Sequence, residues 1–266
     1  MNDQENYKSI NKQLWNEKTE AHVDSEFYNN KEFIAGKNSL NSIELNLLGN
    51  IEDKSILHLQ CHFGQDTLSL ARMGAKTTGL DLSDKAIEVA KQLNTLLNLN
   101  STFICSDVFD APNSLNGQFD MVFTSYGTIG WLPDLNKWAA VISRCLKPNG
   151  KLIFVEFHPV VWMFEYDFSK FKYSYFNDGA IIETNEGTYA DRNAPIKAKE
   201  ISWNHPLSDV FKALLNNGLS IESFEEFDYS PYNCFNNTVE FEPGKFQIKE
   251  LQGIIPMVYA LSAIKK

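Results

Sequence analysis

From about residue 54 onward, short apolar runs alternate with longer amphipathic segments. Five runs have the length and composition of β-strands: 55–59, 76–81, 102–105, 119–124 and 152–157. Helical patterns separate them, including one that starts after Ser83 as its N-cap and one over 134–146. Strands joined by helical crossovers of this length run parallel, because the crossover returns the chain to the same end of the sheet. The pattern predicts an α/β fold with a doubly wound, Rossmann-like sheet.

The end of the chain extends this sheet. A helix over 208–216 is stopped by Asn217-Gly218 and is followed by two strand-like segments, 219–227 and 257–264. We expect these two segments to pair antiparallel at one edge. The full prediction is a seven-stranded, mostly parallel sheet with an antiparallel C-terminal edge.

Two segments fall outside the alternation. Residues 1–53 are helical and amphipathic, and their aromatic side chains could cover the sheet as a lid: Trp15, Phe27, Tyr28 and Phe33. Residues 160–203 hold ten aromatic residues in 44 positions, and those from Trp162 to Phe168 alternate with period two, which predicts an insertion with strand character. The expected organisation is an N-terminal helical lid, 1–53, and a domain over 54–266 that carries the insertion.

Composition and charge exclude several classes of protein. The chain has 266 residues, 43% of them hydrophobic, yet its longest unbroken apolar runs are five residues, far short of the roughly 20 that span a bilayer. No secretory signal is recognised at the N-terminus. With 24 basic and 34 acidic residues the net charge is −10, which repels phosphate backbones. We therefore expect no membrane or nucleic-acid partner, and the sequence does not indicate an oligomeric state.

The four cysteines lie far apart and form no CxxC pair. This spacing favours neither a disulfide framework nor a zinc cluster, so reduced thiols in a cytoplasmic protein are expected.

Candidate chemistry lies where the predicted strands end. In an open parallel sheet, ligands bind beyond the carboxyl ends of the strands. The first strand leads into a tight turn, 60–64, that feeds a helix N-terminus, where free amides favour a polar or anionic group. Asp81 ends the second strand and Asp107 follows the third. Because a carboxylate in the place of Asp81 can accept hydrogen bonds from both hydroxyls of a ribose, the pattern predicts a nucleoside site.

These residues carry a resemblance to a known family. The run ILHLQCHFGQDTL at 56–68, followed by GLDLS at 79–83, resembles the first two motifs of class I S-adenosylmethionine-dependent methyltransferases. The wording LHLQCHFG is similar to that of bacterial small-molecule methyltransferases of unassigned substrate. The resemblance covers roughly residues 54–158. It implies S-adenosylmethionine as the cofactor and methyl transfer to a small-molecule acceptor by in-line displacement.

The first motif departs from the family pattern, in which the strand ends in an acidic residue followed by GxGxG. Here His58 stands in place of the acid, Gln60 and His62 replace the first two glycines, and Gly64 remains. Glycine allows close approach of the backbone and positive φ angles, so side chains at 60 and 62 must point away from the cofactor or contact it. We expect Gln60 to offer its amide to the methionine part of the cofactor and His62 to line the turn.

The resemblance implies the remaining cofactor contacts at the sheet tips. It assigns the ribose diol to Asp81, the adenine amino group to Asp107 and a backbone contact to Val108. The expected cofactor-binding residues are His58, Gln60, Gly64, Asp81, Leu82, Asp107, Val108 and Ser125.

Two residues are candidates for catalysis. Tyr126 follows the fourth strand, and the resemblance places Ser125 and Tyr126 beside the reacting methyl group; a purely structural role for Tyr126 is the alternative. The Asp-Pro-Pro-Tyr run of relatives that methylate amides or adenine is absent here, which disfavours a nucleic-acid substrate. His158 follows the fifth strand, where a neutral imidazole could accept a proton from the acceptor, and a hydrogen-bonded structural histidine is the alternative.

Three other functions have less support in the sequence. A metal site would gather His58, His62, Glu156 and His158, but nothing in the spacing enforces that geometry, and we predict no metal. A nicotinamide-dependent oxidoreductase would need GxGxxG after the first strand, which this chain lacks. A non-catalytic module that retains cofactor binding, or only the Rossmann-like fold, is the main alternative because the glycine motif is altered.

Overall fold

The computed structural model describes residues 6–115 and 117–266. A seven-stranded sheet has the order β3-β2-β1-β4-β5-β11-β8. Its strands are β1 (Ser55–Leu59), β2 (Lys76–Asp81), β3 (Thr102–Cys105), β4 (Phe119–Ser125), β5 (Leu146–Phe157), β8 (Leu219–Phe227) and β11 (Val258–Lys265). The first five run parallel, and β11 runs antiparallel to both β5 and β8. The doubly wound sheet and its antiparallel C-terminal edge are confirmed.

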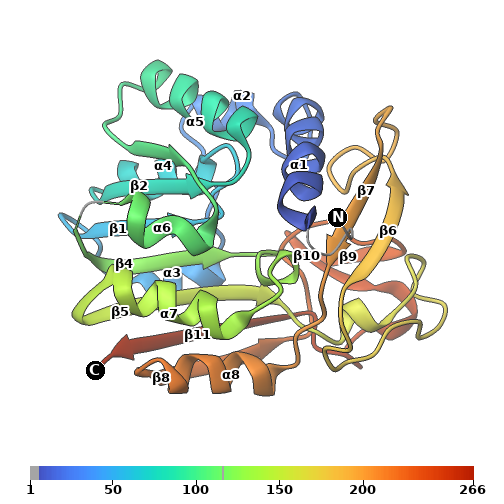
Figure 1. Ribbon diagram of the computed structural model, residues 1–266. Helices are drawn as coiled ribbons and strands as arrows, with labels where there is room; N and C mark the ends of the chain where they lie inside the picture. The colour runs from blue at the N-terminus through green and yellow to red at the C-terminus, as the bar shows by residue number, and fades with distance from the viewer. Residues whose placement is uncertain (1–5, 116) are drawn as a thin grey trace.

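Helices cover both faces of this sheet (Figure 1). One face carries α6 (Ala111–Ser114), α7 (Leu135–Cys145) and α8 (Leu207–Asn216). The other carries α3 (Ser42–Leu48), α4 (Gln65–Arg72) and α5 (Asp84–Leu96). As predicted, Ser83 caps α5, its hydroxyl accepting a hydrogen bond from the Ala86 amide at 3.0 Å. The described residues include no helix long and apolar enough to cross a membrane.

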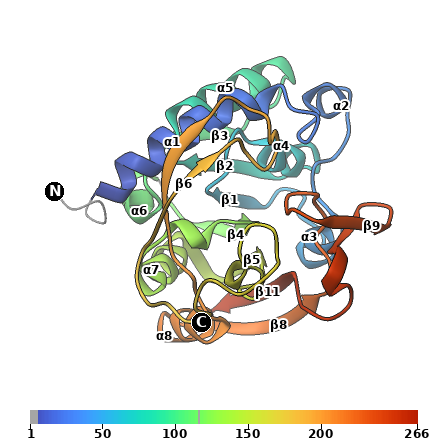
Figure 2. The ribbon, with the colours of Figure 1, turned by 90° about the vertical axis from the view of Figure 1, so that its right-hand side faces the viewer.

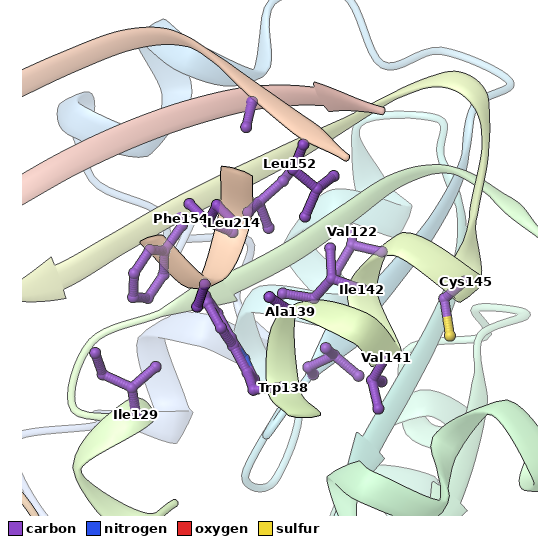
Figure 3. Packing of buried hydrophobic residues seen from close by; sticks show 14 of the residues in the cluster. Val122, Ile129, Trp138, Ala139, Val141, Ile142, Cys145, Leu152, Phe154 and Leu214 are labelled. Atoms are coloured by element: carbon purple, nitrogen blue, oxygen red, sulfur yellow. The ribbon is translucent and has the colours of Figure 1, made fainter. Parts of the chain in front are cut away.

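Side chains of neighbouring strand residues enter two different cores. On β5, Leu152 and Phe154 belong to the core under α7, whereas Ile153 faces α3 and α4. Figure 3 shows the first core, where the rings of Trp138 and Phe154 lie 5.1 Å apart beside Leu214. Because both faces of the central strands β4 and β5 are covered, their buried stretches are largely apolar, and successive residues alternate between the two cores. This rigid sheet fixes the positions of the loops at its carboxyl ends.

The N-terminal segment packs across the carboxyl end of the sheet. It contains α1 (Tyr7–Val23) and α2 (Asn30–Ile34), which are joined by a non-helical loop. Figure 2 shows α1 between α5 and a hairpin of the insertion. Lys12 forms an ion pair with Asp84 of α5 at 2.8 Å, and the Asn11 amide pairs with both backbone groups of Ile201 at 2.8 and 3.0 Å. The helix is therefore fastened on both sides.

The insertion corrects one expectation. Its strands are β6 (Ile181–Glu186) and β7 (Lys197–Ser202), not the alternating aromatic run. Residues Val161–Met163 form the 3-10 turn η4, and Phe164 makes a single bridge with Phe171. The rings of Phe164 and Phe171 stack at 4.5 Å, so the run folds on itself instead of pairing along a strand.

A second hairpin was not predicted. It consists of β9 (Thr238–Glu242) and β10 (Lys245–Ile248), and both hairpins gather at the carboxyl end of the parallel strands (Figure 1). The remaining 3-10 turns are η2 (Val108–Asp110), η3 (Ile129–Trp131) and η5 (Lys249–Leu251).

Candidate active site

A cavity of about 770 Å³ opens at the carboxyl ends of the parallel strands, a size common among small-molecule sites. Its walls come from α1, the loops after β1 to β5, the insertion and the loop after β8. Every residue of the expected cofactor set borders it: His58, Gln60, Gly64, Asp81, Leu82, Asp107, Val108 and Ser125. Tyr126 borders it too. The four aromatic residues expected to cover the sheet also lie on its wall: Trp15, Phe27, Tyr28 and Phe33.

The loop after β1 keeps a left-handed backbone at every second residue although two of the glycines are missing. The φ angles are 56° at Gln60, 50° at His62 and 84° at Gly64. Non-glycine residues in this region are strained, and such residues cluster at functional sites. At Gly64 no side chain fits, because an added Cβ would lie 2.7 Å from a ring carbon of Phe103.

The side chains of this loop point in different directions. The Gln60 amide nitrogen donates to the Thr128 carbonyl at 2.8 Å, and its buried Oε1 has no partner among the described residues. The His62 ring packs 5.4 Å from Trp15 and 5.3 Å from Tyr28. Gln60 thus leaves one amide acceptor at the cavity, and His62 lines the turn under α1.

His58 lies deeper in the same wall. Its Nδ1 is 2.8 Å from the Thr67 hydroxyl, and its buried Nε2 has no partner among the described residues. Burial lowers the pKa of His58 to about 3, so the ring is neutral at physiological pH. The neutral His58 ring can form a hydrogen bond but carries no charge.

Asp81 joins two loops at the tip of β2. One carboxylate oxygen accepts from the His62 amide and the other from the Ser83 amide, both at 2.8 Å. Burial raises the pKa of this carboxyl from its ordinary value, and the two amides act in the opposite direction. Each oxygen of a carboxylate can accept a further hydrogen bond, so Asp81 is positioned and still has acceptor capacity at the cavity.

Asp107 is held by two partners after β3. It accepts from the Phe109 amide at 2.7 Å and forms an ion pair with Lys8 of α1 at 2.6 Å. Val108 beside it is buried, and Leu82 borders the same part of the wall. The N-terminal helix is therefore anchored at the carboxylate expected to contact adenine.

Two carboxyl groups that we did not predict lie behind Ser125 and Tyr126. The Ser125 hydroxyl donates to Asp66 at 3.3 Å, and the Tyr126 hydroxyl donates to Glu44 at 2.9 Å. Asp66 lies in the first turn of α4, inside the motif that suggested the family. Glu44 follows Asn41 at the spacing of a capping box, and the structure has that box; a capping pattern alone gives no sign of the contact with Tyr126.

Glu156 is a further residue that we did not assign to the site. This buried carboxylate ends β5 and accepts from the Gly127 amide, the Thr128 amide and hydroxyl at 2.7 and 2.9 Å, and the Ile129 amide at 3.1 Å. Residues 127–129 line the cavity, so Glu156 fixes the shape of this part of the wall. Both of its carboxylate oxygens already accept hydrogen bonds from the protein.

His158 corrects our assignment of a general base. It does not border the cavity; its Nε2 lies 2.9 Å from Glu226 of β8. The chain after β5 continues to pair with β11 through the His158 amide and the Met257 carbonyl, and the ring points to the edge strand. We therefore withdraw His158 as a catalytic candidate. Across residues 6–115 and 117–266, no three His, Cys, Asp or Glu side chains gather as a metal site.

The charge of Glu44 leads to a testable pH dependence. Burial raises the pKa of this carboxyl from 4.5 to about 7. The folded protein thus retains a proton that an unfolded chain releases, so this stabilisation is complete below about pH 4.5 and is lost as the pH rises to about 7. We expect Glu44→Gln, which stays neutral, to have a free energy of unfolding about 2 kcal/mol above that of the parent at pH 8.

Urea denaturation at pH 5 and pH 8 would measure this effect. The advantage of the variant should shrink towards pH 5, where the parent also holds its proton. Equal differences at the two pH values would contradict the raised pKa.

Comparisons with known proteins agree with this architecture. Residues 56–150 match the family described as methyltransferase domain. An uncharacterised methyltransferase of Synechocystis is 32% identical over 134 residues, which cover 49% of this chain and 60% of that protein. The ubiquinone biosynthesis O-methyltransferase of Coxiella burnetii is 30% identical over 104 residues, covering 39% and 44%. The chain thus matches about half the length of these relatives.

The likeness in structure extends further. A solved S-adenosylmethionine-dependent methyltransferase from Clostridium acetobutylicum superposes with a TM-score of 0.58 over 92% of this chain and 94% of the other, at 17% identity. Residues 56–150 therefore match a methyltransferase domain, and the chain as a whole has the fold of S-adenosylmethionine-dependent methyltransferases.

Proposed function

We propose that the protein transfers a methyl group from S-adenosylmethionine to a small-molecule acceptor by in-line displacement. One observation carries the proposal: Asp81 and Asp107, at the ends of two adjacent strands, border the same cavity as the left-handed loop 60–64.

The residues of the cavity fit this cofactor. Asp81 has acceptor capacity for the ribose hydroxyls, and Val108 and Leu82 supply apolar surface for the base. The buried Oε1 of Gln60, which has no partner in the described chain, suits the polar methionine part. Lys8 is 45% exposed at its side chain, so it can move aside when Asp107 meets the adenine amino group.

The chain acts chiefly by positioning. The bound cofactor supplies a methyl group activated by a positive sulfonium. Holding an acceptor in line with it contributes about 7 to 11 kcal/mol to a reaction of this kind. Residues of α1 and of the insertion form part of the cavity wall and would limit the access of water, which supports a lid role for residues 1–53. Trp15, Tyr28 and Tyr126 offer aromatic faces that attract a cation.

The cavity does not favour the non-catalytic alternative. A module that had lost its site would be expected to fill the altered loop with its own Gln60 and His62 side chains. Instead, both side chains border open volume beside Asp81. A small-molecule acceptor, the absence of a nucleic-acid partner and a cytoplasmic location stay predictions.

The proposal is tested by titration with S-adenosylhomocysteine. We expect Asp81→Ala to weaken binding about 10- to 100-fold, because the ribose hydroxyls lose a charged acceptor contributing about 1.5 to 3 kcal/mol. Glu88→Ala is the matched control: it removes an exposed carboxylate of α5 that pairs with Lys85 and does not border the cavity.

Thermal unfolding of both variants separates loss of binding from loss of folding. Unchanged affinity in a folded Asp81→Ala protein would exclude Asp81 from the site. Failure of the parent to bind at millimolar concentration would contradict the proposed function as a whole.

A further inference from the structure

One wall of the cavity combines two carboxyl groups with tyrosines from distant parts of the chain. Asp66 borders the cavity, and Glu44 lies behind Tyr126, which donates its hydroxyl to it at 2.9 Å. The Tyr232 ring meets Tyr126 edge-on at 5.0 Å, and its hydroxyl accepts a hydrogen bond from Asn41 at 2.7 Å. We name Asp66, Glu44, Tyr126 and Tyr232 the acidic wall.

The carboxyl groups of the acidic wall have only neutral partners. Asp66 accepts from the Ser125 hydroxyl, and Glu44 from Tyr126 and the Asn41 amide. Among the described residues, neither forms an ion pair. Burial without a cation raises the pKa of both carboxyls above their ordinary values. A buried carboxylate without a cation is unfavourable until a cation arrives.

The cations of the cavity are already paired. Of the described residues that line it, the lysines are Lys18, Lys37 and Lys172, and no arginine is present. These lysines lie 3.4, 2.8 and 3.0 Å from glutamates 200, 32 and 183. An acceptor that carried a carboxylate or phosphate would therefore have to compete with these glutamates for a lysine.

An unpartnered polar atom also faces this region. His58 is 2% exposed and borders the cavity, and its Nε2 lacks a partner among the described residues. Its other nitrogen contacts Thr67, the residue that follows Asp66. The wall thus combines negative charge, aromatic faces and a buried hydrogen-bonding position without a partner.

We propose that the methyl acceptor is an amine that binds as a cation against the acidic wall, with its charged nitrogen at Asp66. The inference rests on the proposed methyl transfer and specifies its substrate class. Bringing an ammonium near a sulfonium costs Coulomb energy, and the two carboxylates offset it. The rings of Tyr126 and Tyr232 add cation–π attraction.

The acidic wall also accepts the proton that the ammonium must lose before methyl transfer. Asp66 accepts a proton from the bound ammonium, which leaves a lone pair on nitrogen. The new C–N bond then forms as the C–S bond breaks, and the electron pair of the broken bond stays on sulfur. The products are the methylated ammonium, which carries the positive charge that the sulfonium loses, and S-adenosylhomocysteine, and Asp66 then releases its proton to solvent.

Matched ligands test this assignment. Three sets, with phenylethyl, indolylethyl and n-hexyl frames, each supply a primary amine, an alcohol and a carboxylate on one carbon skeleton. Each is titrated at pH 8 into protein saturated with S-adenosylhomocysteine. We expect at least one amine to bind about tenfold or more tightly than its alcohol, and the carboxylates to bind weakest. The inference would be overturned if no amine bound at 10 mM, or if no amine bound about tenfold more tightly than its own alcohol and carboxylate.

Variants test whether Asp66 of the acidic wall contributes to binding of the amine or of the cofactor. We expect Asp66→Asn to weaken amine binding at least about tenfold and to leave S-adenosylhomocysteine affinity within about threefold, since the change keeps the size of the side chain and removes its charge. Asp53→Asn, at an exposed carboxylate that pairs with Lys76 outside the cavity, is the matched control and should change neither. Equal losses for amine and S-adenosylhomocysteine would show that Asp66 serves the cofactor and would contradict the inference. A parent that binds amines but no S-adenosylhomocysteine would instead contradict the proposed methyl transfer.

Discussion

Replacing Glu156 by alanine is expected to lower the free energy of unfolding by about 3 to 5 kcal/mol, because buried backbone amides lose a charged acceptor. The Glu156 carboxylate accepts hydrogen bonds from the backbone amides of Gly127, Thr128 and Ile129, which follow the neighbouring strand β4, and the residue is 2% exposed. Water cannot replace it without entering the end of β5. Urea denaturation at pH 7 would measure the loss.

Glu156→Gln is the matched variant. It keeps the size and one acceptor oxygen but turns an amide N–H₂ towards other N–H groups, so a smaller loss of about 1 to 3 kcal/mol is expected. The Thr128 carbonyl accepts a hydrogen bond from the Gln60 amide, so a displaced Thr128 would also displace Gln60. This variant should therefore also weaken S-adenosylhomocysteine binding. A loss below 1 kcal/mol for the alanine variant would show that the loop 127–129 finds other acceptors.

Gly64→Ala should destabilise the protein by about 3 kcal/mol for two physical reasons. At φ 84° a side chain carries the left-handed penalty of about 1 to 2 kcal/mol. In addition, the new Cβ would meet Phe103 at 2.7 Å and Ala90 at 3.1 Å, and forced packing of this kind typically costs about 1 to 3 kcal/mol.

Two controls separate these contributions. Gly244 has a φ of 72° and no atom within 4 Å of an added Cβ, so Gly244→Ala reports the backbone penalty alone. Combining Gly64→Ala with Phe103→Leu removes the ring that the Cβ meets, and the double variant should lose less than the sum of the single losses. Additive losses would contradict the steric explanation. Chemical denaturation of the parent, the two single variants Gly64→Ala and Phe103→Leu, and the double variant completes the cycle.

The sheet was predictable because its strands are short, apolar and separated by helices of crossover length. Ser55–Leu59 and Lys76–Asp81 begin and end as expected, since turn residues and a helix cap bound them. The aromatic run from Trp162 to Phe168 was misleading because ring–ring contacts within a loop can also produce alternation. Period two indicates a strand only where a neighbouring strand is present to pair with it.

The site was predictable only where the chain itself fixes a strand tip. Asp81 ends β2, Asp107 comes two residues after the end of β3, and both border the cavity. Glu156 and His158 are two residues apart, and nothing local decides that one serves the loop 127–129 while the other meets Glu226. Those partners come from other strands, so the choice is made by tertiary packing.

Glu44 shows the same limit more strongly. Its spacing from Asn41 predicts a capping box, which the structure contains. The second carboxylate oxygen meets Tyr126, 82 positions away along the chain. No local pattern encodes that encounter.

The fastening of α1 bears on how this protein should be handled at the bench. Lys8 and Asn11 tie the helix to Asp107 on one side and to Ile201 on the other, and both ties lie within the first dozen residues. Trimming those residues to ease crystallisation, or fusing a bulky partner directly ahead of them, would leave the sheet able to fold while detaching one side of the chamber. A sample prepared in that way would give weak ligand affinities that belong to the preparation and not to the protein.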